Sequence, residues 1–306
     1  MKLVTYNIHY TKGRDGCFSS ERIAEAVDGA DVIALNEVER NWARSGMVDQ
    51  PDVLAQLLPN YYWVYGPCLD MDASERDNDG KVHNRRRQFG NMLFSRHPVT
   101  FSRLHPLPTF RCLNNFNMQM GVLEGVIQFS FGAVRFYSVH LSYLSQRERL
   151  VHVQRLLELY RRTDVEGGAW SGSPQSEMGI VWSCGEAEPP NPFDAIILGD
   201  FNFVPGTAEY ELMTGVQAPS EDPVRYYHDF VDSWLVAGEG PDGNTYTFNP
   251  NNERSHGQRI DYGFVSASLA DRLIAARVDR DAVGSDHQPL WIEIDLETPK
   301  ERQALQ

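Results

Sequence analysis

Residues 197–204 read ILGDFNFV, and this stretch decides the fold class. The apolar run Ala195–Leu198 predicts a buried strand, which Gly199 ends with a turn. Asp200 and Asn202 follow two residues apart, so in extended geometry their side chains leave on the same side. A carboxylate and a carboxamide there suit the positioning of a water molecule and a phosphoryl oxygen, although Gly, Asp and Asn also form ordinary turns.

The chain of 306 residues is acidic, with a net charge of −14 and a hydrophobic fraction of 42%. This composition is that of a globular protein with a sizeable core. The acidic balance discourages nonspecific attraction to nucleic acid or anionic membranes, without excluding a local basic groove. Scattered cysteines favour reduced thiols and a cytoplasmic location. No cleavable signal and no apolar run of the ~20 residues that span a bilayer is expected, and the oligomeric state stays open.

Strands outnumber helices along the chain. Apolar or alternating runs predict strands at Leu3–Ile8, Asp31–Leu35, Tyr61–Tyr65, Asn91–Ser95, Val122–Phe129, Val134–Leu141, Ala195–Leu198, Ile260–Val265 and Pro289–Ile294. Helices are predicted at Glu21–Val27, from Pro51 to Leu58, and at Ser145–Arg162, where Ser145 and Glu148 suit a capping box. This organisation favours two packed mixed sheets flanked by helices, in a single domain over residues 1–306.

Two stretches, Asp70–Arg87 and Thr163–Pro192, are expected to be long loops. Loops of this length in a compact domain tend to be functional or disordered. The first carries the run Arg85-Arg86-Arg87, which suits either a phosphate clamp or a solvated loop that neutralises nearby acids. Strands continue on both sides of each stretch, so neither is expected to link two domains.

Further strand ends carry polar side chains of the kind seen at Asp200. They are Asn7, Glu37, His140, Asp261 and the pair Asp286-His287. Each alone has an ordinary explanation as a turn former, a solvated acid or a structurally hydrogen-bonded histidine. Together they place acids, amides and two histidines where α/β folds gather their active sites. This set of oxygen-rich donors without thiolates favours Mg²⁺ or Mn²⁺ over zinc.

The order of these motifs resembles that of the endonuclease/exonuclease/phosphatase superfamily. The matching segments are TYNIH, NEVE, GNMLFSR, VHL, GDFN, RIDYGF and SDHQPL, which run from residue 5 to residue 290. The resemblance implies a four-layer α/β sandwich, with two central sheets and outer helices. It also implies hydrolysis of phosphoesters by an activated water molecule, in a reaction that depends on a divalent metal ion.

The same resemblance implies roles around the metal and the water. Glu37 matches the main ligand of Mg²⁺ or Mn²⁺, with Asn7 beside it and Asp286 within reach of a metal. Asp200 would orient or deprotonate the attacking water, and Asn202 would hold that water or a phosphate oxygen.

For the histidines, the resemblance implies catalysis and phosphate binding. His287 matches the family's catalytic histidine, and Asp261 matches the buried carboxylate that fixes its tautomer. His140 matches the phosphate-binding histidine of the deoxyribonuclease and sphingomyelinase branches. Asn91 matches a polar position near His140, and Asn36 stands where many relatives have glutamine.

The substrate is less defined by the sequence. An acidic chain without long basic helices favours a small or lipid-derived phosphoester, in a pocket walled partly by residues 70–87 and 163–192. A DNA endonuclease or exonuclease, with Arg85 and Arg87 as its phosphate clamp, is the alternative. A third possibility is an inactive binding protein on the same fold.

Overall fold

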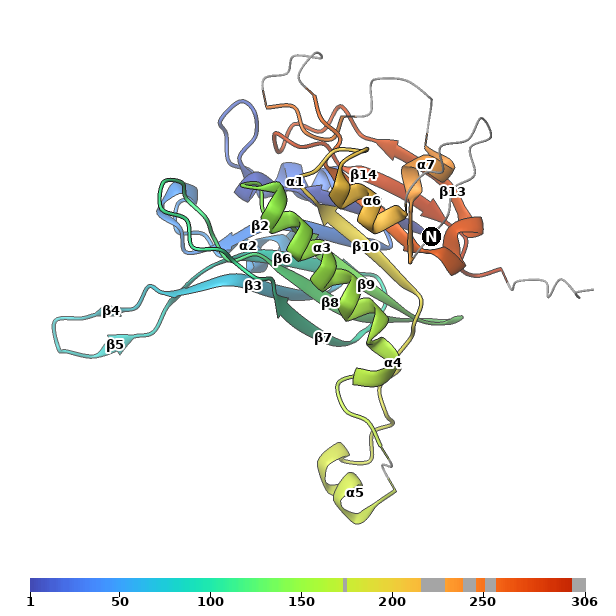
Figure 1. Cartoon of the computed structure of the whole chain (residues 1–306). Coiled ribbons are helices and arrows are strands. Elements are labelled where there is room, and N and C mark those ends of the chain that lie inside the picture. The colour runs from blue at the N-terminus through green and yellow to red at the C-terminus, as the bar shows by residue number, and fades with distance from the viewer. Residues whose placement is uncertain (173–174, 216–228, 239–245, 251–256, 299–306) are drawn as a thin grey trace, which may run out of the picture.

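Two large mixed sheets pack face to face in this protein, with helices on the outside (Figure 1). The computed structural model describes residues 1–172, 175–215, 229–238, 246–250 and 257–298. One sheet has the strand order β13-β14-β1-β2-β6-β3, and the other has the order β11-β12-β10-β9-β8-β7. The predicted fold class, an α/β sandwich of two central mixed sheets flanked by helices, is therefore confirmed.

The strands of the first sheet are β1 (Lys2–Asn7), β2 (Val32–Arg40), β3 (Tyr62–Asp72), β6 (Arg86–Ser95), β13 (Leu273–Val278) and β14 (Leu290–Ile294). Those of the second are β7 (Val99–Pro106), β8 (Gly121–Phe129), β9 (Gly132–His140), β10 (Ala195–Asp200), β11 (Phe230–Asp232) and β12 (Asp261–Ser266). All nine predicted strands are present, although β2 and β3 continue past their predicted ends and β6 begins before its predicted start. The exposed edge strand β13 was missed, as was β7, in which exposed residues alternate with more buried ones.

The helices are α1 (Ser20–Val27), α2 (Gln50–Leu57), α3 (Gln146–Arg161), α4 (Thr163–Glu166), α5 (Glu177–Ser183), α6 (Ala208–Thr214) and α7 (Ser233–Ala237), with 3-10 turns η1 (His9–Thr11), η2 (Ala43–Ser45) and η4 (Ala267–Arg272). The three predicted helices are confirmed as α1, α2 and α3. Ser145 caps α3 by accepting from the backbone N–H of Glu148, but the Glu148 carboxylate binds Ser142 and Asn117 instead of completing a capping box. Among the described residues, no helix is both long and apolar enough to cross a membrane.

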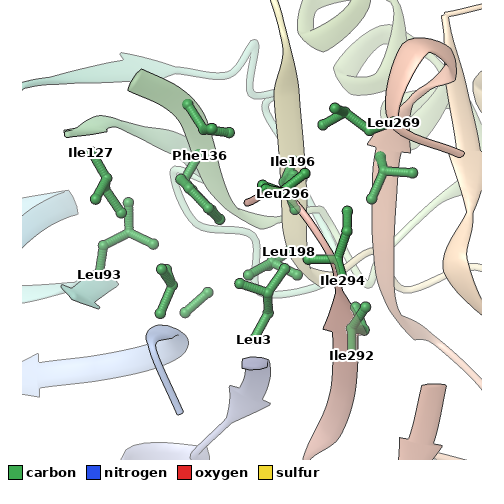
Figure 2. Packing of buried hydrophobic residues seen from close by; sticks show 14 of the residues in the cluster. Leu3, Leu93, Ile127, Phe136, Ile196, Leu198, Leu269, Ile292, Ile294 and Leu296 are labelled. Atoms are coloured by element: carbon green, nitrogen blue, oxygen red, sulfur yellow. The ribbon is translucent and has the colours of Figure 1, made fainter. Parts of the chain in front are cut away.

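Three apolar layers hold the sandwich together. The central layer lies between the sheets and joins residues of both, including Leu3, Leu93, Ile127, Phe136, Ile196, Leu198 and Ile292 (Figure 2). A second layer packs α1 and α2 on the first sheet, and a third packs α3 and α6 on the second sheet. Apolar burial on both faces fixes the register of the central strands, since a slip of one residue would reverse every side chain.

The stretch Asp70–Arg87 is not an irregular loop, which corrects the sequence prediction. Strand β3 continues to Asp72, β6 begins at Arg86, and β4 (Glu75–Arg76) pairs with β5 (Val82–His83) between them. Cross-strand ion pairs, such as that of Arg86 with Asp70, stabilise this hairpin. The sequence did not predict these strands, because the hairpin is charged and none of its residues is buried in a core.

The stretch 163–192 contains α4 and α5, apart from residues 173–174, which lie outside the described part. Figure 1 shows α5 beyond the end of α3, away from the sheets. Asn191 and Pro192 accept hydrogen bonds from Arg135, near the start of β9. The segment therefore lies at the opposite end of β9 from His140, so the prediction that it walls the pocket is wrong.

Candidate active site

The polar strand ends meet at one edge of the sandwich. Within the second sheet, Asp200 pairs with His140 of β9 on one side and with Asp261 of β12 on the other. Strand β1 ends beside β10 at Asn7, whose amide reaches Asp200 across the two sheets. The ends of parallel strands, and the start of an antiparallel one, meet at the same edge, which explains the convergence.

Asp200 lies at the centre of this cluster, and its side chain is almost fully buried. Its Oδ2 accepts from Asn7 Nδ2 at 2.9 Å, and lies 3.5 Å from His140 Nε2 and 3.8 Å from His287 Nε2. Its Oδ1 accepts from the backbone N–H of Asn202 at 2.9 Å. Burial, followed by the negative charge of Asp261, raises the pKa of Asp200 to about 6.

Asn202 both forms a turn and contributes a polar side chain to the site. It closes a turn on Asp200 with a left-handed backbone, φ 53°, so the predicted extended geometry does not hold. Its side chain donates to the carbonyl of Leu141, and the residue lines the same cavity as Asp200. A turn therefore brings the amide to the site, in place of the alternation of a strand.

Glu37 reaches the site through a bulge in β2, a strand that continues to Arg40 and does not end at Leu35 as predicted. The register shifts between Leu35 and Val38, and Glu37 has φ 60°. A left-handed backbone at a glutamate costs on the order of 1–3 kcal/mol, and such strain is characteristic of functional positions. Glu37 Oε1 accepts from Asn7 Nδ2 at 3.0 Å and lies 4.0 Å from His140 Nε2.

Asn7 is buried between the two carboxylates. Its Nδ2 donates to both Glu37 and Asp200, while its Oδ1 accepts from the backbone N–H of His9. In this geometry Asn7 directs its amide hydrogens, and not its oxygen, at the carboxylates. It thus fixes the spacing of Glu37 and Asp200.

His287 and Asp261 form a buried pair, with His287 Nδ1 and Asp261 Oδ2 2.8 Å apart. Burial opposes a charged imidazole, but the charge and hydrogen bond of Asp261, followed by the charges of Asp200 and Asp286, raise the pKa of His287 to about 10. The pairing at Nδ1 directs Nε2 towards Asp200.

Asp286, the residue before His287, lies 3.2 Å from His9 Nδ1. Burial acts to raise its pKa, but the hydrogen bond with His9 holds the pKa of Asp286 below its usual range. An ionised carboxylate therefore faces the cavity from the loop before β14.

The other predicted residues lie outside the cavity. Asn91 is buried and donates to the carbonyls of Gly121 and Ser138, so that it holds β8 and β9 together near His140. Arg85 pairs with Glu75 in the hairpin. Arg87 donates to the carbonyl of Asn41 and is absent from the cavity lining. The structure therefore does not bring Arg85, Arg87 or Asn91 into contact with this cavity.

A cavity of about 350 Å³ opens over the cluster. The lining consists of His9, Tyr10, Glu37, Arg44, Phe89, Met118, Met120, His140, Tyr143, Asp200, Asn202, Phe248, Gln258, Ile260, Asp286 and His287. Most of the aromatic and apolar members were missed by sequence reasoning, because they come from loops without periodicity. His9 and Tyr10, with Thr11, form a run of left-handed residues at φ 43°, 44° and 67°, which only the structure reveals.

The donors around the cavity fit a divalent cation. Asp200, Asp261 and His287 each bring one ligand atom within 4.8 Å of the other two, the one such group of three among the described residues. Asp261 Oδ1 is buried and has no hydrogen-bond partner among the residues that the structure describes. Glu37 and Asp286, both predicted ligands, add carboxylates that face the cavity. Carboxylate oxygens are the ligands that a hard cation prefers.

Residues 4–287 match the sequence profile of the Endonuclease/Exonuclease/phosphatase family, and the chain therefore belongs to this family. Members of the family are metal-dependent phosphoric ester hydrolases, so this protein is an enzyme of that class. The resemblance seen in the motifs is thus confirmed. No curated protein matches the chain in sequence.

Solved structures of the family share the fold. An endonuclease/exonuclease/phosphatase from Beutenbergia cavernae is 20% identical, with 95% of this chain and 70% of that chain covered and a TM-score of 0.58. The mannosyl-6-phosphatase of Bacteroides thetaiotaomicron is 16% identical, with 96% and 99% covered and a TM-score of 0.60. A 3' phosphatase from Neisseria, bound to a product DNA hairpin, is 17% identical, with 96% and 99% covered and a TM-score of 0.54.

Proposed function

We propose that this protein hydrolyses a small or lipid-derived phosphoester by direct attack of water, with Mg²⁺ or Mn²⁺ as its cation. The observation that carries this proposal is the position of the Asp200 carboxylate between the Nε2 atoms of His140 and His287. A buried carboxylate flanked by two imidazoles can take a proton from water while the imidazoles donate to phosphoryl oxygens.

In this proposal, different residues of the site accept the proton of water and donate hydrogen bonds to the phosphoryl oxygens. Asp200, held by Asn7, accepts the proton of the attacking water, and the Asn202 amide donates to that water or to a phosphoryl oxygen. His140 Nε2 donates to a non-bridging oxygen. His287, kept positively charged by its neighbour Asp261, stabilises the charge that develops on the oxygens. No Ser, Cys or Lys is present in the described lining of the cavity, which supports attack by water and not by a side chain.

Glu37 is the proposed main ligand of the cation, and Asp286, which lines the same cavity, is a proposed further ligand. When bound, the cation would supply positive charge to the phosphoryl oxygens. The group of Asp200, Asp261 and His287 also fits a cation by distance, but His287 Nδ1 and Asp261 Oδ2 are already hydrogen-bonded to each other. Asn7 would act by orienting Glu37 and Asp200. The choice of Mg²⁺ or Mn²⁺, the single domain and the cytoplasmic location stay predictions.

The cavity and the charge distribution support a small substrate. A volume of about 350 Å³ suits a phosphorylated head group. The arginines of the hairpin are partly neutralised, since Arg85 pairs with Glu75 and Arg86 with Asp70. A nucleic-acid enzyme would need a continuous basic track, which a net charge of −14 disfavours.

The test compares substrates and metals with the purified full chain. Bis(para-nitrophenyl) phosphate, para-nitrophenyl phosphate, phospholipids, plasmid DNA and abasic DNA are assayed with Mg²⁺, with Mn²⁺ and in excess chelator. We expect chelator-sensitive hydrolysis of at least one small or lipid ester, with a mild dependence on ionic strength.

Two outcomes would contradict the proposal. Undiminished turnover in chelator would refute the role of the cation. Efficient DNA cleavage that weakens by about 10³–10⁵ between 50 and 200 mM salt would instead favour the alternative function, a nuclease.

A further inference from the structure

Arg44 carries the only guanidinium or ammonium group in the described lining of the active-site cavity. It comes from the turn η2 that follows β2, and its side chain is 40% exposed. The catalytic scheme above assigns it no task. An arginine at the wall of a cavity otherwise rich in carboxylates requires a separate physical explanation.

A buried glutamate fixes the orientation of this guanidinium. Glu39 Oε2 accepts from Arg44 Nε at 3.0 Å and from Arg44 Nη2 at 2.7 Å, and the Glu39 side chain is fully buried. Two hydrogen bonds to one edge of the planar fork leave the Nη1 edge without a hydrogen-bond partner among the described residues. Glu39 thus holds Arg44 and leaves donors for a ligand.

Aromatic rings enclose the same group. The central carbon of the Arg44 guanidinium lies 4.2 Å from the ring centre of Tyr10, 4.7 Å from that of Trp42 and 5.9 Å from that of Phe89. Trp42 is itself anchored, because its Nε1 donates to the carbonyl of Gln88 at 2.8 Å. The guanidinium is therefore preorganised, and little side-chain entropy would be lost when it binds an anion.

Phe89 lies near both Arg44 and His140. The centre of the Phe89 ring is 6.4 Å from that of the His140 ring and 5.9 Å from the central carbon of the Arg44 guanidinium. Both residues line one cavity, so a ligand whose phosphoryl group lies at His140 can extend past Phe89 to Arg44. What Arg44 contacts is then a part of the substrate distinct from the reacting group.

We propose that Arg44 is a specificity-determining residue that binds a second anionic group of the substrate, a phosphate or a carboxylate. This inference rests on the proposed function and narrows its substrate class to phosphoesters with a further anionic oxygen group. The alternative is that Arg44 only neutralises Glu39. That role needs only the Nε and Nη2 edge, and it gives no task to the Nη1 donors of a residue that lines the cavity.

The experiment measures competitive inhibition of bis(para-nitrophenyl) phosphate hydrolysis at constant ionic strength. The inhibitors are propanediol monophosphate and propanediol bisphosphate, followed by the butanediol and hexanediol pairs, and by carboxyalkyl phosphates in which a carboxylate replaces the second phosphate. We expect the second anion to strengthen inhibition of the wild type by about 10- to 100-fold for the chain length that fits. In Arg44→Gln this ratio should fall to near one.

Arg40→Gln is the matched control. Arg40 also pairs with a carboxylate, Asp49, and stacks on a ring, that of Tyr65, but it does not line the cavity. It should keep the wild-type inhibition ratio. If Arg44→Gln does not fold, Arg44→Lys keeps the charge without the fork, and Glu39→Gln removes the residue that positions Arg44. Each should lower the ratio, with thermal melting to report the fold.

The outcomes separate the two proposals. An unchanged ratio in folded Arg44→Gln, or loss of stability with no loss of the ratio, would mean a structural role only and would overturn the inference. Absence of turnover of every ester would instead refute the proposed function. In that case calorimetric titration with the same monophosphates and bisphosphates still tests Arg44, because it requires binding alone.

Discussion

Lowering the pH below about 4.5 is expected to destabilise this fold through one buried carboxylate, that of Glu124 in β8. Glu124 joins three strands of the second sheet. It receives hydrogen bonds from Arg103 and pairs with His105, both on β7, and it forms an ion pair with the fully buried Arg135 of β9. Burial favours the neutral acid, but the hydrogen bonds of His105 and Arg103 and the charge of Arg135 lower the pKa of Glu124 to about 2.

The magnitude follows from the change in pKa. A fall from 4.5 to about 2 corresponds to on the order of 3 kcal/mol, at about 1.4 kcal/mol per pH unit. Because the folded-state pKa is the lower one, this stabilisation is complete above pH 4.5 and is lost as the pH falls towards 2. In Glu124→Gln the contribution is absent at every pH. That variant should also lose about 3–5 kcal/mol at neutral pH, since Arg135 stays buried without its counter-ion.

The assay is urea unfolding followed by tryptophan fluorescence, at pH values from about 7 down to about 3. The difference in unfolding free energy between wild type and Glu124→Gln should be largest at neutral pH and should shrink below pH 4.5. Glu158→Gln is the control, because Glu158 forms an exposed pair with Arg155 and its loss should change stability by less than about 0.5 kcal/mol. A difference that stays constant with pH would refute the reasoning.

Three further predictions concern the site and its scaffold. Asp261→Asn should lower kcat by about 10²–10⁴ in protein that still unfolds cooperatively on heating, and a loss under tenfold would contradict the role of the pair with His287. Glu37→Gln should abolish most of the turnover and weaken calorimetric binding of Mn²⁺, whereas unchanged metal affinity would move the cation to another ligand set. Gly199→Ala should destabilise by about 3 kcal/mol or more, because its Cβ would lie 1.9 Å from the Val139 carbonyl oxygen; a melting temperature equal to that of the wild type would contradict this.

Much of the site could be predicted from the sequence, because its residues follow apolar runs that end abruptly. Asn7, His140 and Asp200 each close a buried strand, and parallel strands end at a common edge. Their convergence therefore follows once the strands are assigned. The hydrogen bond of His287 with Asp261, expected at ~2.6–3.2 Å, is 2.8 Å long. The roles of these residues stay proposals.

The position of Glu37 depends on a β-bulge that the local sequence does not predict. The sequence indicates a strand that ends at Leu35, since polar residues follow. The strand instead continues through a bulge, which turns Glu37 into the cavity at φ 60°. Neighbouring strands hold that strained backbone, and no property of residues 36 and 37 alone specifies it.

The positions of the hairpin of residues 70–87 and of the segment 163–192 could not be predicted from their sequences. Both are polar stretches whose position depends on where the flanking elements end, so composition indicates a loop but not its direction. The hairpin runs on from β3 and β6, and α5 lies beyond α3 (Figure 1). Neither lines the cavity that both were expected to wall.

The sequence by itself determined the buried strands, the helices α1, α2 and α3, and the acids, amides and histidines at the strand ends. Apolar periodicity and abrupt changes from apolar to polar residues are local properties of the chain. Only the tertiary structure decided which loops wall the cavity. Tyr10, Arg44 and Phe89 come from an N-terminal turn, the turn after β2 and strand β6, and their meeting depends on how the strands are ordered in the first sheet. Contacts between such distant segments follow from the packing of whole elements, and no local pattern of residues encodes them.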